Sequence, residues 1–127
     1  MTLKTIGLPV MGGYDFFPVK DIIMCQAQDN CTHFHLTTKP GKIKISRTLK
    51  WTEKLLDNHY FFRVHDSFII NLLHIKKYRK GGEGGMVELT GGIEINVARR
   101  KKEVFFKVLL DLNIISSGYE EILPVRE

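Results

Sequence analysis

The chain has 127 residues, a formal net charge of +5 and a hydrophobic fraction of 43%. This length suits a single domain with a real core, and this hydrophobic fraction argues against a disordered chain. Residues 114–127 hold three Glu against one Arg, a net charge of −2, so residues 1–113 carry +7. Such a basic domain favours a polyanionic partner, although many basic proteins bind no nucleic acid.

The chain has no stretch that approaches the roughly 20 apolar residues needed to cross a bilayer. Its N-terminus lacks the basic region, apolar run and cleavage site of a secretory signal peptide. Cys25 and Cys31 are its two cysteines, and their spacing favours reduced thiols over a disulfide framework. We therefore expect a cytoplasmic protein with no membrane partner.

Strand patterns dominate the first half of the chain. Short apolar or alternating runs, separated by glycine, proline and polar turns, predict five strands over residues 6–10, 14–19, 22–27, 32–38 and 42–46. A helix is predicted over residues 47–57, because Leu49, Thr52 and Leu55 recur at helical spacing. Ser46 is the expected N-cap of this helix.

The second half continues with a strand over residues 75–80 and a loop at Gly81–Gly85. Four glycines in five residues cost too much backbone entropy for a regular element. Residues 86–90 and 93–98 predict a hairpin closed by the two-residue turn Gly91-Gly92. Apolar residues at helical spacing predict a last helix over residues 100–112.

The segment Phe61–Ile75 is the most informative part of the chain. It begins apolar, changes to a polar patch that includes His65, Asp66 and Ser67, and becomes apolar again around Asn71. This pattern predicts a strand that ends in polar groups and continues into a short buried turn.

Four consecutive cations, Arg99 to Lys102, follow the alternating strand over residues 93–98. A phosphate backbone is attracted to such a field and releases counterions on binding, and Arg can form a forked contact with guanine. The alternative is a solvated first turn of the last helix. That alternative is weakened because cations at a helix N-terminus oppose the helix dipole.

Two other kinds of site have weaker support. His33 and His35 share a strand face and could approach one metal ion together with His65 or Cys31, but the spacing of a zinc finger is absent. The consecutive residues His65, Asp66 and Ser67 would point in different directions rather than converge as a catalytic triad. We therefore expect no metal, no cofactor and no enzymatic activity.

Several motifs occur in an order that resembles the LytTR DNA-binding domains of bacterial transcription regulators. They are Asp21-Ile22-Ile23 with Asp29-Asn30-Cys31-Thr32, Ser46-Arg47-Thr48-Leu49-Lys50, Phe62-Arg63-Val64-His65 with Ser67-Phe68 and Ile70-Asn71, and Ile95-Asn96-Val97-Ala98-Arg99-Arg100. The resemblance covers roughly residues 6–110. It implies a mostly β fold, an elongated assembly of about ten strands with two to three short helices. We expect this domain at residues 6–112 and an acidic C-terminal tail at 113–127.

The resemblance also implies sequence-specific binding of double-stranded DNA through loops inserted into the major groove, with bending of the duplex. The candidate base contacts are Thr32, Asp66 and Arg99. The candidate phosphate contacts are His33, Arg100, Lys101 and Lys102. His65, Ser67 and Asn71 are expected to brace the loop.

Two positions depart from the family pattern. Asp66 stands where Arg or Asn is more usual, and Ala98 stands where Ser is usual. A carboxylate at position 66 repels phosphates, but it can accept a hydrogen bond from cytosine N4. Alternatively, it can hold Arg63 or a nearby Lys.

The resemblance further implies possible binding of a second copy to a paired DNA site, and an upstream receiver or sensor domain that this chain does not contain. The alternative function is a non-enzymatic protein-interaction β domain that docks a partner through its edge strands. An RNA-binding module ranks third, because exposed aromatic residues for base stacking are not evident.

Overall fold

The computed structural model describes residues 4–116. The strands are β1 (Thr5–Val10), β2 (Gly13–Pro18), β3 (Ile22–Gln28), β4 (Cys31–Leu36), β5 (Lys42–Ile45), β6 (Phe61–His65), β7 (Phe68–Asn71), β8 (Ile75–Arg79), β9 (Met86–Leu89) and β10 (Ile93–Asn96). The helices are α1 (Leu49–Leu55) and α2 (Lys102–Asp111), with 3-10 turns η1 (Val19–Asp21), η2 (Leu72–His74), η3 (Thr90–Gly92) and η4 (Arg99–Lys101). This content confirms the predicted mostly β fold of about ten strands.

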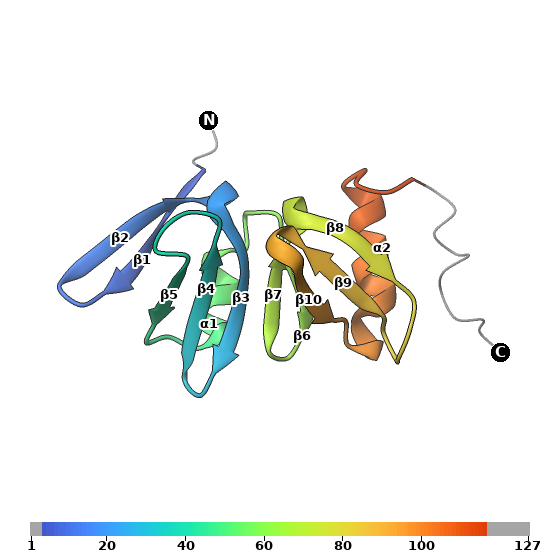
Figure 1. The fold of residues 1–127 in the computed structure, drawn as a ribbon, viewed down its shortest axis with the longest axis horizontal. Helices are drawn as coiled ribbons and strands as arrows, with labels where there is room; N and C mark the ends of the chain where they lie inside the picture. The colour runs from blue at the N-terminus through green and yellow to red at the C-terminus, as the bar shows by residue number, and fades with distance from the viewer. Residues whose placement is uncertain (1–3, 117–127) are drawn as a thin grey trace.

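The strands form three antiparallel sheets arranged along an elongated molecule (Figure 1). The central sheet has the order β5-β4-β3-β7-β6, the hairpin β1-β2 lies at one end, and the sheet β10-β9-β8 lies at the other. Helix α1 covers the central sheet, and α2 lies against the sheet of β8 to β10. In the described part of the chain, no helix is long and apolar enough to cross a membrane.

The central sheet separates two hydrophobic cores. The N-terminal core lies between the hairpin β1-β2, the central sheet and α1, and it consists of Ile6, Leu8, Val19, Ile22, Cys25, Phe34, Leu36, Ile45, Leu49, Leu56 and Ile69. The C-terminal core lies between the central sheet, the sheet β10-β9-β8 and α2. It consists of Ile23, Met24, Val64, Ile70, Leu72, Val87, Leu89, Ile95, Val97, Phe105, Phe106 and Leu109.

The polar patch in Phe61–Ile75 is the turn of a hairpin. Strand β6 leads into it, and the apolar residues after it form β7, which pairs with both β3 and β6. The expectation of a short buried turn after residue 67 was therefore wrong for Phe68–Asn71. A run that is buried on both faces lacks the alternation by which a strand is identified, and Ile69 and Ile70 are indeed both buried.

Three element boundaries also differ from expectation. Thr48, rather than Ser46, caps α1, because its hydroxyl oxygen accepts a hydrogen bond from the Trp51 N–H. The β9-β10 hairpin pairs Leu89 with Ile93 and so has the three-residue connection of η3 rather than a two-residue turn. The last helix starts at Lys102, after the separate turn η4.

The C-terminal tail was expected over residues 113–127, and residues 117–127 lie outside the described part of the chain. The described start of this segment continues the fold. The Asn113 N–H donates to the Leu110 carbonyl, and Ile115 packs against the C-terminal core.

Asn71 links the central sheet to the turns η1 and η2. Its side chain is 1% exposed. The amide nitrogen donates to the Ile22 carbonyl at 2.9 Å, and the amide oxygen accepts from the Leu73 N–H at 3.0 Å. Asn71 thus satisfies backbone groups on two elements, as expected for a bracing residue.

We predict that Asn71→Ala lowers the free energy of unfolding by about 2–4 kcal/mol, because it leaves a buried carbonyl and a partly buried N–H without partners. Urea denaturation followed by circular dichroism measures the change. The control is Asn58→Ala at an exposed position after α1, where we expect a change within about 0.5 kcal/mol. Equal effects of the two substitutions would contradict this role.

Candidate nucleic-acid interface

Three turns lie at the same edge of the molecule, at the bottom of Figure 1. They are the β3-β4 turn (Asp29 and Asn30), the β6-β7 turn (Asp66 and Ser67) and η4. We call this surface the loop edge. In the central sheet β3 and β7 are antiparallel neighbours, so the end of β3 lies beside the start of β7. The β3-β4 turn and the β6-β7 turn are therefore at the same end of the sheet.

The β6-β7 turn is held by three hydrogen bonds. The Ser67 N–H donates to His65 Nδ1 at 3.1 Å, and the Ala27 N–H donates to the Ser67 carbonyl at 2.9 Å. Arg63 Nη2 donates to the Asp66 carbonyl at 2.7 Å. The bracing role expected of His65 is confirmed, whereas Ser67 contributes through its backbone.

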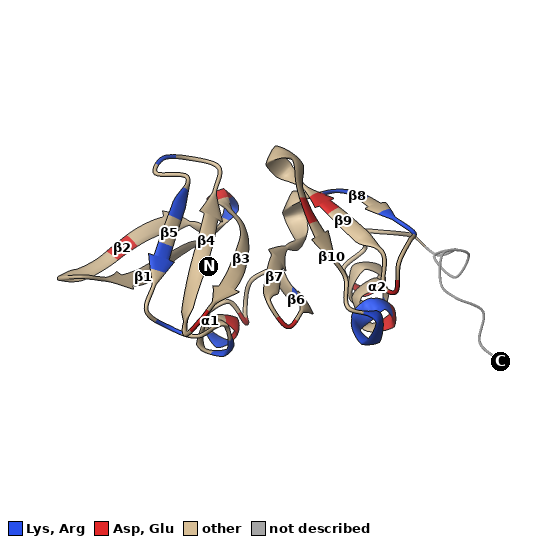
Figure 2. Ribbon diagram, turned by 60° about the horizontal axis from the view of Figure 1, so that its bottom comes forward, with Lys and Arg blue, Asp and Glu red and all other residues tan. Residues whose placement is uncertain are grey.

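The carboxylate of Asp66 forms an ion pair with Arg100 Nη2, which joins the β6-β7 turn to η4. The two side chains are 78% and 61% exposed, so water screens the pair and it adds little to stability. Its main effect is electrostatic, because the Asp66 carboxylate reduces the positive potential of the loop edge. In Figure 2 the acidic β6-β7 turn lies between the basic residues of α1 and those at the start of α2.

The cations of η4 follow a buried backbone segment. Val97 is 3% exposed, the chain turns at Ala98, and Arg99 and Arg100 are exposed. Lys101 Nζ lies 5.9 Å from the centre of the Phe62 ring, a favourable cation–π arrangement. Within residues 4–116, no ion pair joins Arg99 to another side chain. Arg99 is therefore available to an external acceptor.

Thr32 has a different position from the one expected of a base contact. Its side chain is fully buried, and its hydroxyl donates to the Arg47 carbonyl at 2.8 Å. The hydroxyl of Thr52 lies 3.2 Å from it. Thr32 thus joins β4 to the start of α1 inside the fold, and we no longer assign it to the interface. Both residues of this turn, Asp29 and Asn30, are exposed, and Asn30 carries the amide group that can both donate and accept a hydrogen bond.

His33 lies on the open face of the central sheet, next to the lysines of β5. It pairs with Lys44, and His35 pairs with Lys42. Desolvation, followed by the charges of Lys42 and Lys44, lowers the pKa of His33. Desolvation also lowers the pKa of His35, whose Nε2 lies 3.3 Å from Gln26 Oε1. Both imidazoles are therefore neutral at pH 7 and can act there as hydrogen-bond donors.

The described residues contain no group of three or more His, Cys, Asp or Glu side chains that could hold a metal ion. Cys25 is fully buried, and burial raises the pKa of its thiol. Cys31 is half-buried and free. The chemistry that this edge offers is therefore that of exposed guanidinium, ammonium, amide and carboxylate groups.

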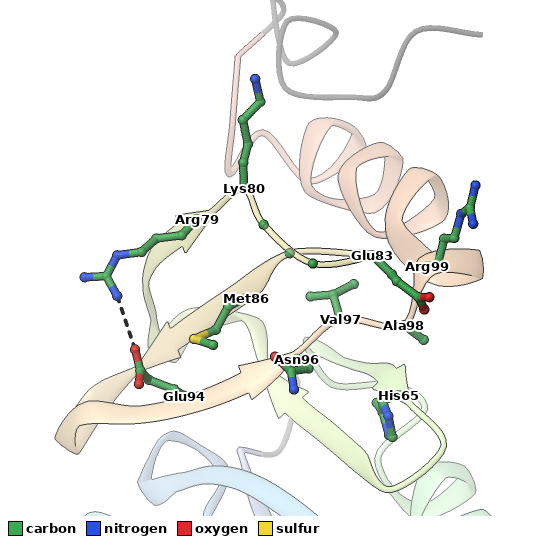
Figure 3. Close-up of a pocket in the computed structure, with 14 residues that line it drawn as sticks. His65, Arg79, Lys80, Glu83, Met86, Glu94, Asn96, Val97, Ala98 and Arg99 are labelled. Atoms are coloured by element: carbon green, nitrogen blue, oxygen red, sulfur yellow. Dashed lines mark hydrogen bonds and ion pairs between the residues drawn. The ribbon is translucent and has the colours of Figure 1, made fainter. Parts of the chain in front are cut away.

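A groove of about 670 Å³ lies beside Arg99 (Figure 3). The loop Gly81–Gly85 forms one wall, His65 and Ala98 lie on the other side, and Arg79 and Glu94 pair at 3.2 Å at the far end. The groove places the β8-β9 loop next to the cations of η4.

Of the residues expected at the interface, the structure brings Asp66, Arg99, Arg100 and Lys101 together at the β6-β7 turn and η4. Lys102 follows as the first residue of α2. His33 lies apart, on β4. Arg63, expected as one partner of the Asp66 carboxylate, instead donates to the Asp66 carbonyl, while the carboxylate pairs with Arg100.

Comparisons with known proteins agree on one family. A family model described as the LytTr DNA-binding domain matches residues 13–110. The transcriptional regulatory protein LytR of Staphylococcus aureus, strains N315 and USA300, is 35% identical over 81 residues, which cover 63% of this chain. The match covers 32% of those relatives, so the chain spans about a third of their length. A solved LytTr DNA-binding domain from Bacillus cereus has the same fold, with a TM-score of 0.71, 23% identity and coverage of 86% of this chain and 99% of that one.

We predict that Thr32→Val lowers the free energy of unfolding by about 1–2 kcal/mol, because the Arg47 carbonyl loses its donor while the side-chain volume is kept. Urea denaturation measures the effect. Thr37→Val is the control, since the Thr37 hydroxyl is exposed and its hydrogen bonds are long, at 3.4 and 3.5 Å. If Thr32→Val is as stable as the wild type, the buried hydroxyl does not have the role described.

Proposed function

The chain belongs to the LytTr DNA-binding domain family, and we therefore propose that it is the sequence-specific, double-stranded DNA-binding module of a bacterial transcriptional regulator. The observation that carries this proposal is the loop edge, where exposed Arg99 and Arg100 come two and three residues after the buried Val97. Turns that are anchored to strands hold such side chains in defined positions. The module acts by binding alone, without an enzymatic step, and its place of action is the cytoplasm, where bacterial DNA lies.

The proposed contacts fall into two classes. Arg99 reads a base, with its guanidinium forked onto guanine O6 and N7 in the major groove. Asn30 replaces Thr32 as the reader on the β3-β4 turn, since an exposed amide can pair with adenine. Arg100, Lys101 and Lys102 bind phosphates and set the register of the protein on the duplex.

Two further residues complete the proposed interface. His33 donates a hydrogen bond to a phosphate from the open face of the central sheet. Asp66 is the remaining candidate reader on the β6-β7 turn, as an acceptor for cytosine N4. Its carboxylate has to leave Arg100 when a phosphate takes that guanidinium.

The wider assembly is also a proposal. The curated relatives carry the name transcriptional regulatory protein, and the match covers only 32% of their length. We propose that a receiver or sensor domain elsewhere in the regulator supplies the signal, and that a second copy binds a paired site on the same DNA.

A protein-interaction domain is the second candidate function. The observation in its favour is the exposed aromatic pair on β2, where Tyr14 and Phe16 are 65% and 69% exposed with ring centres 6.4 Å apart. A pull-down that recovers a protein partner, together with no shift of any duplex in a gel, would favour this alternative. A duplex pool enriched by selection from random DNA would exclude it as the main function.

We predict that Arg99→Ala reduces affinity for the selected duplex about 10- to 100-fold, because a forked contact to guanine discriminates by about 1–3 kcal/mol. Affinity for unrelated duplexes should fall only slightly. Arg100→Ala and Lys102→Ala should weaken binding to all duplexes alike and reduce the slope of log Kd against log salt by about 0.9 for each lost phosphate contact. Fluorescence anisotropy at several salt concentrations measures both quantities.

Lys20→Ala is the matched control for these substitutions, since Lys20 is exposed on η1, at the opposite end of β3 from the β3-β4 turn. It removes one positive charge away from the loop edge and should leave both the affinity and the salt slope nearly unchanged. Binding that does not depend on salt, or a random pool that shows no enrichment, would refute the proposed function.

We predict that Asp66→Asn raises affinity for unrelated duplexes about 3- to 5-fold at low salt, because it removes a repulsive carboxylate and releases Arg100. If Asp66 also reads cytosine, selection with this variant will show a changed preference at one position. Asp15→Asn, which removes an exposed acidic charge on β2, is the control. The same affinities and preferences for Asp66→Asn and wild type would rule out both roles of Asp66.

A further inference from the structure

The loop Gly81–Gly85 lies against the backbone that leads into Arg99. A Cβ atom added at Gly84 would lie 2.0 Å from the Val97 carbonyl oxygen and 2.9 Å from the Ala98 carbonyl carbon. Only a residue without a side chain allows this approach. The loop and the segment Val97-Ala98 are thus in direct backbone contact, as Figure 3 shows.

Hydrogen bonds hold this contact in place. The Val97 N–H donates to the Gly85 carbonyl at 2.9 Å. The Tyr78 hydroxyl donates to the Gly84 carbonyl at 2.9 Å, and the Gly85 N–H closes the loop onto the Gly81 carbonyl at 2.9 Å. Burial raises the pKa of Tyr78, so its hydroxyl stays protonated and remains a donor.

The same backbone segment is held from its other side by β6. The Ala98 N–H donates to the Val64 carbonyl at 2.8 Å, and Val64 is fully buried. Val97 and Ala98 therefore have consecutive N–H groups bound to two different elements. Arg99 is the next residue, so its Cα position follows from where these two elements meet.

The length of the loop supports a role beyond closing the β8-β9 hairpin. The last pair of that hairpin is Arg79 with Met86, which leaves six residues between the strands, whereas two residues suffice to close a hairpin. Four of the six are glycine, which raises the entropic cost of ordering them. The contacts with Val97 and Ala98 are what this ordered loop provides.

We propose that the glycine loop, through Gly84, is a positioning element for Arg99 and so determines sequence preference without touching a base. This inference rests on the proposed function. A forked contact with guanine requires the guanidinium to be placed within about 0.5 Å. A methyl group at Gly84 requires the loop and the Val97 carbonyl to separate from 2.0 Å to at least 3.0 Å, and this change in their relative position is twice that tolerance.

The test compares binding of the selected duplex with binding of an unrelated duplex. Gly84→Ala should lower affinity for the selected duplex about 10-fold and leave the unrelated duplex within about 2-fold, since phosphate contacts tolerate the shift. Circular dichroism and thermal melting establish that the variant is folded. The expected outcome is a loss of specificity in a folded protein.

Two glycine controls separate the clash from loop entropy. An added Cβ meets nothing within 4 Å at Gly13 or at Gly82, and Gly82 belongs to the same loop. Gly13→Ala should bind both duplexes as the wild type does. Gly82→Ala carries backbone strain at a φ of +55°, and it should cost stability without a comparable loss of specificity.

A second variant keeps the test valid if Gly84→Ala fails to fold. Tyr78→Phe adds no bulk and removes the hydroxyl that holds the Gly84 carbonyl. It should lower affinity for the selected duplex about 2- to 5-fold, since the loop loses one of its anchoring hydrogen bonds, with the unrelated duplex unchanged. Equal affinities of Tyr78→Phe and wild type for the selected duplex would overturn the proposal.

A double-mutant cycle tests whether the loop acts through Arg99. In an Arg99→Ala background, Gly84→Ala should have almost no further effect on the selected duplex, because the group that it positions is gone. Fully additive losses would refute the positioning role. If the wild type binds the selected duplex and Gly84→Ala behaves as Gly13→Ala does, the positioning proposal alone fails. If the wild type shows no salt-dependent duplex binding, the proposed function fails and the positioning role with it.

Discussion

The fold depends on the central strand pair β3-β7, which is buried on both faces. Along β3, Cys25 packs into the N-terminal core and Met24 into the C-terminal core, and on β7 Ile69 and Ile70 divide in the same way. These two strands connect the two cores, because one face of each strand packs into the N-terminal core and the other face packs into the C-terminal core. Removing apolar residues from β3 or β7 would therefore separate the halves of the molecule, whereas β4 and β5 need only one apolar face.

The relative positions of the three turns at the loop edge follow from this arrangement. The hydrogen bond from the Ala27 N–H to the Ser67 carbonyl ties the β6-β7 turn to the end of β3. The hydrogen bond from the Ala98 N–H to the Val64 carbonyl ties η4 to β6. The β6-β7 turn is thus fixed to the strand that leads into the β3-β4 turn, and η4 is fixed to the strand that leads into the β6-β7 turn. Such turns can present side chains to a duplex with little loss of conformational entropy on binding.

Most of the strands were predicted from the sequence, among them β4, whose buried residues alternate, and β3, which is buried on both faces. The alternation in β4 and the composition of the glycine turns identified most of the strands, and the Arg99–Lys102 cluster was evident from local composition alone. Strand β7 was misread because it has only four residues, follows a polar turn directly and, being buried on both faces, shows no alternation. Thr32 was expected to contact a base, although alternation along the strand places it on the same face as the buried Phe34. Its assignment came from its position in the family pattern, and its hydrogen bond to the Arg47 carbonyl could not be foreseen.

Contacts between distant segments could not be predicted from one sequence, and they decide how the loop edge works. Asp66 and Arg100 are separated by 34 positions. Gly84 meets Val97 because β10 pairs with β9, so that the residues after Asn96 continue alongside the glycine loop. A carboxylate among four cations weakens attraction to every phosphate equally. A fixed Arg99 favours only the duplexes that offer it an acceptor in the right place. Specificity is a difference between affinities, so the carboxylate lowers the affinity for all duplexes without changing that difference. The positioned Arg99 creates the difference, because it restores affinity only for duplexes that offer its acceptor.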